Sequence, residues 1–134
     1  MDSLDPHRWR EFAEMDLNAA EHLLNTMRPA PYEIICYHCQ QSAEKYLKGY
    51  LILCTKAEQP HIHDLAVLCK LCEKINPLFS QIMDICSELT EYGIQPKYPL
   101  EMYVEKADAL NAIQDAKNLR NFLQNHAAEL FSAV

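Results

Sequence analysis

Apolar side chains recur along most of the chain at intervals of three and four residues, which is the period of an amphipathic α-helix. The sequence lacks strand-like alternation, and prolines or Gly93 separate the periodic stretches. The predicted helices cover about residues 6–27, 32–55, 65–76, 78–92 and 104–131. The pattern therefore predicts an all-α protein, an up-and-down antiparallel bundle of about five helices that forms a single domain over residues 1–134.

Local signals support several of these helix ends. Asp5 is placed to cap the first helix, with Pro6 suited to its first turn, and Asp64 is placed to cap the third. In the fourth helix, the helical spacing predicts an inward-facing row of Leu78, Ile82, Ile85 and Leu89. The loop after Gly93 is too rich in proline for regular structure.

The chain has 134 residues and a formal net charge of −7. Binding long nucleic acid over a broad surface requires many clustered Lys and Arg contacts to phosphates, so this charge argues against that mode but leaves a small basic site open. The first residues are acidic and polar, unlike a signal peptide, and no apolar run is long enough to span a bilayer. We therefore expect a soluble cytoplasmic protein without a membrane segment.

Six cysteines include two Cys-x-x-Cys pairs, Cys36 with Cys39 and Cys69 with Cys72. Zinc-binding pairs usually lie in tight turns, whereas these pairs lie within helical patterns and align with core residues. We expect these cysteines to be small, buried core residues with reduced thiols. No disulfide and no metal site is therefore predicted.

The second predicted helix carries a polar stripe opposite its core stripe. At about 100° per residue, His38, Gln41, Lys45 and Lys48 fall within one narrow arc. An imidazole, an amide and two ammonium groups at this spacing can converge on an anionic ligand such as a nucleotide or a partner carboxylate. The alternative is a solvated face of long polar side chains. On this helical wheel neither Lys45 nor Lys48 lies on the core face.

Three segments in register resemble the HEPN domain, a nucleotide-binding helical family of higher eukaryotes and prokaryotes. They are residues 37–51 (YHCQQSAEKYLKGYL), 61–65 (HIHDL) and 92–99 (YGIQPKYP). Residues 8–24 (RWREFAEMDLNAAEHLL) also resemble the opening helix of that family. The resemblance covers nearly the whole chain in the expected order, and it implies a fold more directly than an activity.

The resemblance implies a homodimer that often works beside a separately encoded minimal nucleotidyltransferase, as in toxin–antitoxin pairs. No fixed cofactor is implied, and a nucleotide such as ATP is the expected ligand. The expected binding residues are His38, Gln41, Lys45, Lys48, His63, Asp64, Lys97 and Tyr98. For His63 and Asp64, a structural hydrogen bond and helix capping are the alternatives to ligand or metal binding. For Lys97 and Tyr98, the alternative to base stacking and phosphate binding is a packed surface loop.

An enzymatic alternative depends on Arg120 and His126. Ribonucleases of the wider HEPN superfamily resemble one another in an Arg followed after four to six residues by a His, and the segment RNFLQNH fits that form. The resemblance would imply metal-independent RNA cleavage, in which His126 assists proton transfer and Arg120 steadies the phosphate. On a straight helix the two side chains diverge by about 120°, so convergence requires a bend or a dimer partner. A third hypothesis is a non-catalytic oligomerising scaffold.

Overall fold

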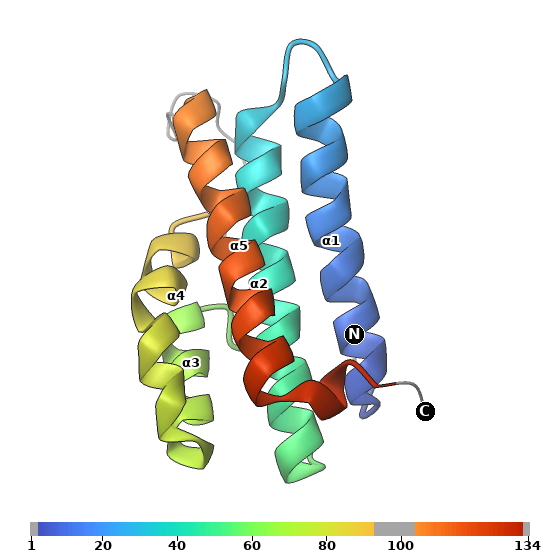
Figure 1. Ribbon diagram of the computed structural model, residues 1–134, viewed down its shortest axis with the longest axis vertical. Coiled ribbons are helices and arrows are strands. Elements are labelled where there is room, and N and C mark those ends of the chain that lie inside the picture. The colour runs from blue at the N-terminus through green and yellow to red at the C-terminus, as the bar shows by residue number, and fades with distance from the viewer. Residues whose placement is uncertain (1–2, 93–103, 133–134) are drawn as a thin grey trace.

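The computed structural model describes residues 3–92 and 104–132, and within these ranges it is helical without any strand (Figure 1). The helices are α1 (Pro6–Thr26), α2 (Tyr32–Thr55), α3 (Leu65–Ile75), α4 (Met83–Thr90) and α5 (Lys106–His126), with two short 3-10 helices, η1 (Pro77–Ile82) and η2 (Ala128–Leu130). The all-α helical bundle that the periodicity predicts is therefore confirmed. No helix in the described ranges is long and apolar enough to cross a membrane.

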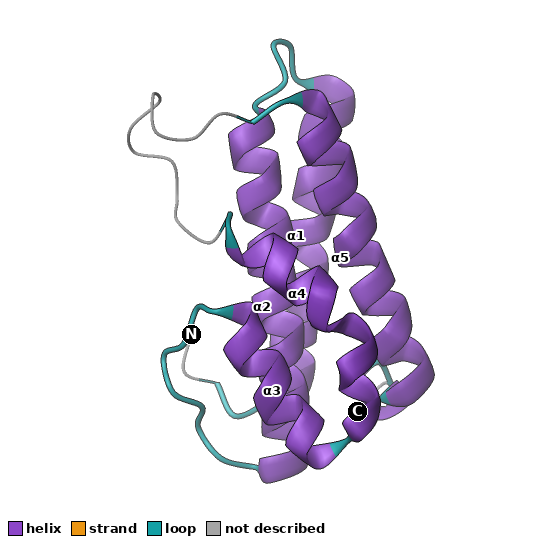
Figure 2. Cartoon of the chain, turned by 90° about the vertical axis from the view of Figure 1, so that its left-hand side faces the viewer, coloured by secondary structure: helices purple, strands orange, loops and turns teal. Residues whose placement is uncertain are grey.

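The central helix of the bundle is α2. It runs antiparallel to α1, while α5 lies along a second side and the shorter α3 and α4 lie along a third. In Figure 2 the two short helices lie in front of the long ones. Because three sets of neighbours cover α2, most of its residues between Ile35 and Ile52 are buried. The polar positions of α2 lie between α1 and the segment that leads into α3.

Two close contacts bind α1 to α2. The buried Ser42 hydroxyl donates a hydrogen bond to the Ala13 carbonyl oxygen at 2.7 Å. Farther along α2, a Cβ atom added to Gly49 would lie 3.2 Å from the Trp9 Cβ and 3.3 Å from the Pro6 carbonyl oxygen. Glycine at this position therefore allows the start of α1 to approach the backbone of α2 closely. Together these contacts set the rotation of α1 against α2.

The core placement predicted for the cysteines is confirmed. Cys36, Cys39, Cys69 and Cys72 are all free thiols and fully buried, whereas Cys54 is exposed near the end of α2. Burial, with a smaller contribution from nearby carboxylates, raises the pKa of the Cys36 thiol to about 12. These thiols therefore pack as small apolar groups.

The prediction of one continuous fourth helix over about 78–92 is wrong. Asn76 adopts an extended conformation and its side chain accepts a hydrogen bond from the Leu78 amide, so the chain restarts as η1 before α4 begins at Met83. The break turns Leu78 outward, and Ile75, which aligns with the core cysteines on the wheel, is also exposed. Phe79 fills the core instead. A turn stabilised by a side chain has here overridden helical periodicity.

The last helix is shorter than the predicted span of about 104–131. It begins at Lys106, where a reciprocal capping box joins Glu105 and Asp108, and the Glu105 amide donates to an Asp108 carboxylate oxygen at 2.8 Å. It ends at His126, because Ala127 leaves the helical conformation before the short η2. The helix end therefore places His126 at the terminus of α5.

Candidate functional site

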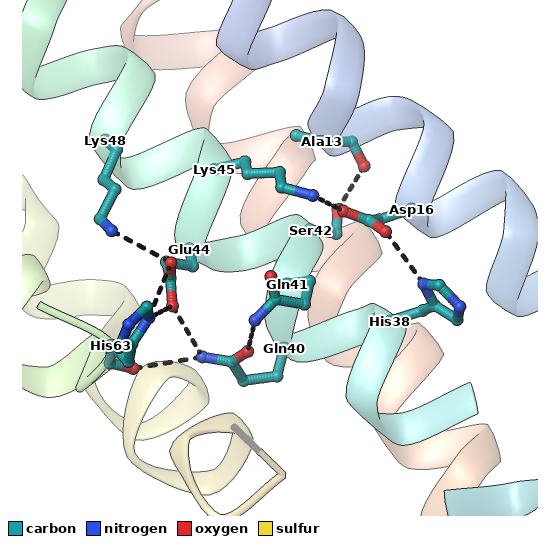
Figure 3. Close-up of polar contacts among 10 residues, drawn as sticks. All are labelled: Ala13, Asp16, His38, Gln40, Gln41, Ser42, Glu44, Lys45, Lys48 and His63. Atoms are coloured by element: carbon teal, nitrogen blue, oxygen red, sulfur yellow. Dashed lines mark hydrogen bonds and ion pairs between the residues drawn. The ribbon is translucent and has the colours of Figure 1, made fainter. Parts of the chain in front are cut away.

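The polar stripe predicted on the second helix is present, but it is divided between two carboxylates (Figure 3). We call the connected side chains the α2 polar face: Asp16, His38, Gln40, Gln41, Glu44, Lys45, Lys48 and His63. One carboxylate comes from α1 and the other from α2 itself. Each gathers an imidazole and an ammonium group.

The first group, which we call the Asp16 cluster, joins α1 to α2. His38 Nδ1 lies 2.9 Å from one Asp16 carboxylate oxygen, and the Lys45 ammonium donates to the other. Burial alone would raise the pKa of Asp16, but hydrogen bonds from His38 and Lys45 outweigh it and hold this pKa below its usual value. The carboxylate is therefore charged at neutral pH and holds both partners in place.

The second group, which we call the Glu44 cluster, is more deeply buried. The Lys48 ammonium lies 3.1 Å from Glu44 Oε2, and the two side chains are only 7% and 6% exposed. His63 Nδ1 lies 3.0 Å from Glu44 Oε1. The Gln40 amide donates both to Glu44 Oε1, at 3.3 Å, and to the His63 carbonyl oxygen, at 3.2 Å. These contacts fasten the segment before α3 to α2.

The expectation that Lys48 lies off the core face is wrong. Lys48 is buried, and its ammonium group lies 6.0 Å from the centroid of the Trp9 ring as well as beside Glu44. The physical reason is the close approach of α1 at Gly49, which covers this end of the polar stripe. Lys45 keeps the predicted position, because its side chain is half-buried beside Asp16.

His63 combines an exposed ring with a buried anchor. Its side chain is 68% exposed, although the Glu44 carboxylate that it contacts is almost inaccessible. A carboxylate at Nδ1 keeps a proton on that nitrogen and fixes the orientation of the ring. The other nitrogen, Nε2, therefore faces away from Glu44. It accepts a hydrogen bond when the ring is neutral and donates one when the ring is protonated. His38 is held in the same way by Asp16. The structure thus orients two imidazoles on one face.

The remaining predicted binding residues have different environments. Gln41 lies between the clusters and donates a hydrogen bond to Gln40 at 2.7 Å. Asp64 caps α3 by accepting hydrogen bonds from the amides of Ala66 and Val67, as its position in the sequence predicts. Lys97 and Tyr98 lie outside the described residues.

Arg120 and His126 pack against different neighbours. Arg120 lies close enough to the buried Tyr46 of α2 to lower the pKa of its hydroxyl, although burial of that hydroxyl dominates and raises this pKa overall. His126 is exposed at the end of α5, and its ring lies 4.6 Å from that of Phe122. Among the described residues, the Tyr46 hydroxyl and Arg120 Nε are the buried side-chain polar atoms without a hydrogen-bond partner.

The sequence reasoning missed both carboxylates of the α2 polar face. Glu44 could have been found, because it precedes Lys48 by four residues, the spacing at which Glu and Lys pair on a helix. Asp16 gave a weaker signal. It precedes Leu17 on a helix whose buried residues include Ala13 and Ala20, and only the packing of α1 against α2 brings it to His38 and Lys45.

Each cluster contains one carboxylate, one ammonium and one imidazole group. The cluster is formally neutral when its imidazole is neutral and gains one positive charge when the imidazole is protonated. An anion bound at Nε2 would stabilise the protonated ring, so the face can receive a phosphate although the protein as a whole is acidic. Within residues 3–92 and 104–132, no three His, Cys, Asp or Glu side chains are grouped to hold a metal ion.

The family model described as the HEPN domain matches residues 6–126 of the chain. No curated protein and no solved structure matches the chain. The matched span includes α1 to α5 and every residue of the α2 polar face. The chain therefore belongs to the HEPN domain family.

Proposed function

We propose that the chain is a binding module whose α2 polar face receives the phosphate groups of a nucleotide such as ATP. The assembly that we propose is a homodimer that works beside a minimal nucleotidyltransferase in a toxin–antitoxin-like pair. The observation that carries the proposal is that each imidazole of this face is held by a carboxylate less exposed than the imidazole itself. An anchored ring that keeps an accessible edge, as His63 does, is preorganised for ligand recognition.

This arrangement favours binding over a merely solvated face. On a solvated face, long polar side chains lose little by remaining mobile, and exposed ion pairs contribute only about 0 to 1 kcal/mol. Here His38 and Lys45 share one carboxylate whose pKa is lowered, and Lys48 is buried in an ion pair. Side chains that are already ordered lose less entropy when a phosphate binds them.

The exposed ring of His63 distinguishes binding from a purely structural role. The Asp16 cluster joins two helices, and interhelical contact alone would explain it in an oligomerising scaffold. The contact between Gln40 and the His63 carbonyl oxygen already fastens the segment before α3. Packing therefore does not require an imidazole fixed in place with its outer nitrogen accessible, whereas phosphate binding does.

Calorimetric titration with ATP tests the proposal, with adenosine as the ligand that lacks phosphates. We expect Lys45→Ala and His63→Asn each to weaken ATP binding by about tenfold, which corresponds to the loss of one charge-assisted hydrogen bond. Adenosine binding should not depend on either substitution. Lys117→Ala is the matched control, because Lys117 of α5 also forms an ion pair with a carboxylate of α1, Glu21 at 3.2 Å, but lies outside the α2 polar face.

Two results would contradict the proposal in different ways. If both variants bind ATP as the wild type does, the polar face is a solvated surface. If instead they dissociate a dimer or lose helical circular dichroism, the face is structural and the scaffold hypothesis replaces the binding module.

One observation favours a second candidate, a metal-independent endoribonuclease that uses Arg120 and His126. The buried Nε of Arg120 has no partner among the described residues, and a buried N–H without a partner is costly unless a ligand or water satisfies it. Because α5 runs without a break from Lys106 to His126, the two side chains diverge by about 120°, and a shared RNA site would require a second chain.

The ribonuclease hypothesis is tested by incubating the protein with RNA in the presence of a metal chelator. We expect little cleavage by the wild type. Efficient cleavage that disappears in both Arg120→Ala and His126→Ala, but persists in Lys45→Ala, would establish the second candidate in place of the first.

A further inference from the structure

The outer surface of α3 carries an apolar stripe that the bundle does not cover. Val67 and Ile75 are 41% and 42% exposed, and Leu71 between them is partly buried. These positions are four residues apart, so they lie along one side of the helix. Leu78 in η1 is exposed to the same extent as Ile75. The adjoining side of α3 provides the core contacts through Leu65, Leu68, Cys69 and Cys72.

Two lysines border this stripe. Lys70 and Lys74 follow Val67 by three and seven residues, so both project along the same edge of the apolar stripe. Neither forms an ion pair with a described residue. Like charges four residues apart repel each other on a helix, and an acidic partner would relieve this repulsion.

The charge pattern disfavours a second copy of the same helix as the occupant. If two α3 helices paired antiparallel about a two-fold axis, equal edges would meet and Lys70 would face Lys74 of the other copy. The carboxylate within α3 belongs to Glu73, which lies on the far side of the lysines from the apolar stripe. A second α3 therefore offers no negative charge where the lysines require it.

We propose that the outer face of α3 docks an amphipathic helix of another protein, with apolar residues against Val67, Leu71 and Ile75 and acidic residues against Lys70 and Lys74. Apolar anchors along one helix face supply affinity in this mode of recognition, and the flanking charges select the partner. The surface is separate from the α2 polar face, because the two share no residue. The proposal therefore does not depend on nucleotide binding.

Selection from a displayed peptide library tests the proposal. The probes are three-turn helical peptides with fixed leucines along one side and with Glu or Lys varied at the flanking positions. The wild type should enrich Glu at these positions, and the charge-reversed variant Lys70→Glu/Lys74→Glu should enrich Lys. Val67→Asp should weaken the binding of the selected acidic peptide by about tenfold or more. Met15→Asp is the control, because Met15 is an exposed apolar residue of α1.

Circular dichroism would confirm that all variants keep the fold, as expected for substitutions at exposed positions. The proposal is overturned if no peptide is enriched by the wild type, or if the charge-reversed variant keeps the preference for Glu. It is also overturned if the wild type sediments as a dimer that Val67→Asp converts to a monomer, because a second copy would then cover this face.

Discussion

Asp16 and Asp115 are the same residue type in two regions of the bundle, and their carboxyl groups respond to folding in opposite ways. Asp16, between α1 and α2, has a lowered pKa because His38 and Lys45 outweigh the effect of burial. Asp115 lies in a groove between α4 and α5, where burial, a hydrogen bond with Glu88 and the charge of Glu88 raise its pKa to about 7. The described residues that line this groove include no Lys or Arg.

The comparison shows how neighbouring charges decide the pKa of a partly buried carboxyl group. On the α2 polar face, an ammonium group and an imidazole lie against each carboxylate. In the α4–α5 groove, two carboxyl groups share a proton or repel each other, and no cation among the described residues fixes them. The raised pKa of Asp115, taken alone, would have marked the α4–α5 groove as the candidate functional site.

The largest effect is expected from Lys48→Ala, which leaves Glu44 buried without its ammonium partner. Loss of one member of a buried ion pair typically costs about 3–5 kcal/mol, and His63 can compensate part of it, so we expect a loss near the lower end, about 3 kcal/mol. Chemical denaturation measures the change. The double variant Glu44→Gln/Lys48→Met should recover most of the stability, since it removes both charges and keeps the volume. Equal losses in the single and double variants would show that packing, rather than charge, stabilises this cluster.

A smaller loss, about 2 kcal/mol at neutral pH, is expected from Asp16→Asn, because hydrogen bonds to a charged group contribute about 1.5–3 kcal/mol. Since folding lowers the pKa of Asp16, its stabilisation is present above the ordinary value of 3.8 and is lost as the pH falls through the folded value. The difference between wild type and variant should therefore shrink in acid. A difference that stays constant with pH would contradict the assigned ion pairs.

Asp115→Asn should stabilise the protein, whereas Asp16→Asn destabilises it. Between the ordinary pKa of 3.8 and about 7, the folded protein holds a proton on Asp115 that the unfolded chain has released, so Asp115 lowers stability progressively as the pH rises through this window. Near pH 3.8 the variant should melt at the same temperature as the wild type. Above about pH 7 it should melt at a higher temperature than the wild type. Glu88→Gln should reproduce the effect, and a stabilisation confined to acid pH would refute the shared proton.

The smallest effect on stability is expected from Lys45→Ala. Lys45 is half-buried, and Asp16 keeps its contact with His38 when Lys45 is removed, so we expect a loss of no more than about 1 kcal/mol. Chemical denaturation beside Lys48→Ala gives the direct comparison of the two lysines. If both substitutions cost the same, the difference in burial between the two clusters has no energetic consequence.

Helix positions were predictable where the determining interactions are local. The second helix was expected at about residues 32–55 and spans Tyr32–Thr55, and Asp64 caps α3 as expected, because periodicity and capping act within a few residues. The break before α4 was missed because the extended Asn76 and its hydrogen bond to Leu78 override a regular apolar pattern.

The candidate site was only partly predictable, because it depends on how helices pack. The wheel placed His38, Gln41, Lys45 and Lys48 on one arc, and these side chains do share a polar face. Their division between two carboxylates depends on the rotation of α1 that brings Asp16 to α2. The burial of Lys48 depends on the close approach at Gly49. Neither the position of Asp16 nor the burial of Lys48 can be predicted from the pattern of one helix, because both depend on how α1 packs against α2.

The most direct test of phosphate binding at the α2 polar face is to follow the imidazole nitrogen resonances of all six histidines by NMR while ATP is added. We expect the Nε2 resonances of His38 and His63 to shift together and to saturate. The resonances of His22, which is exposed on α1, and of His126, at the end of α5, should not move. Unchanged resonances for His38 and His63, or a response confined to His126, would contradict it.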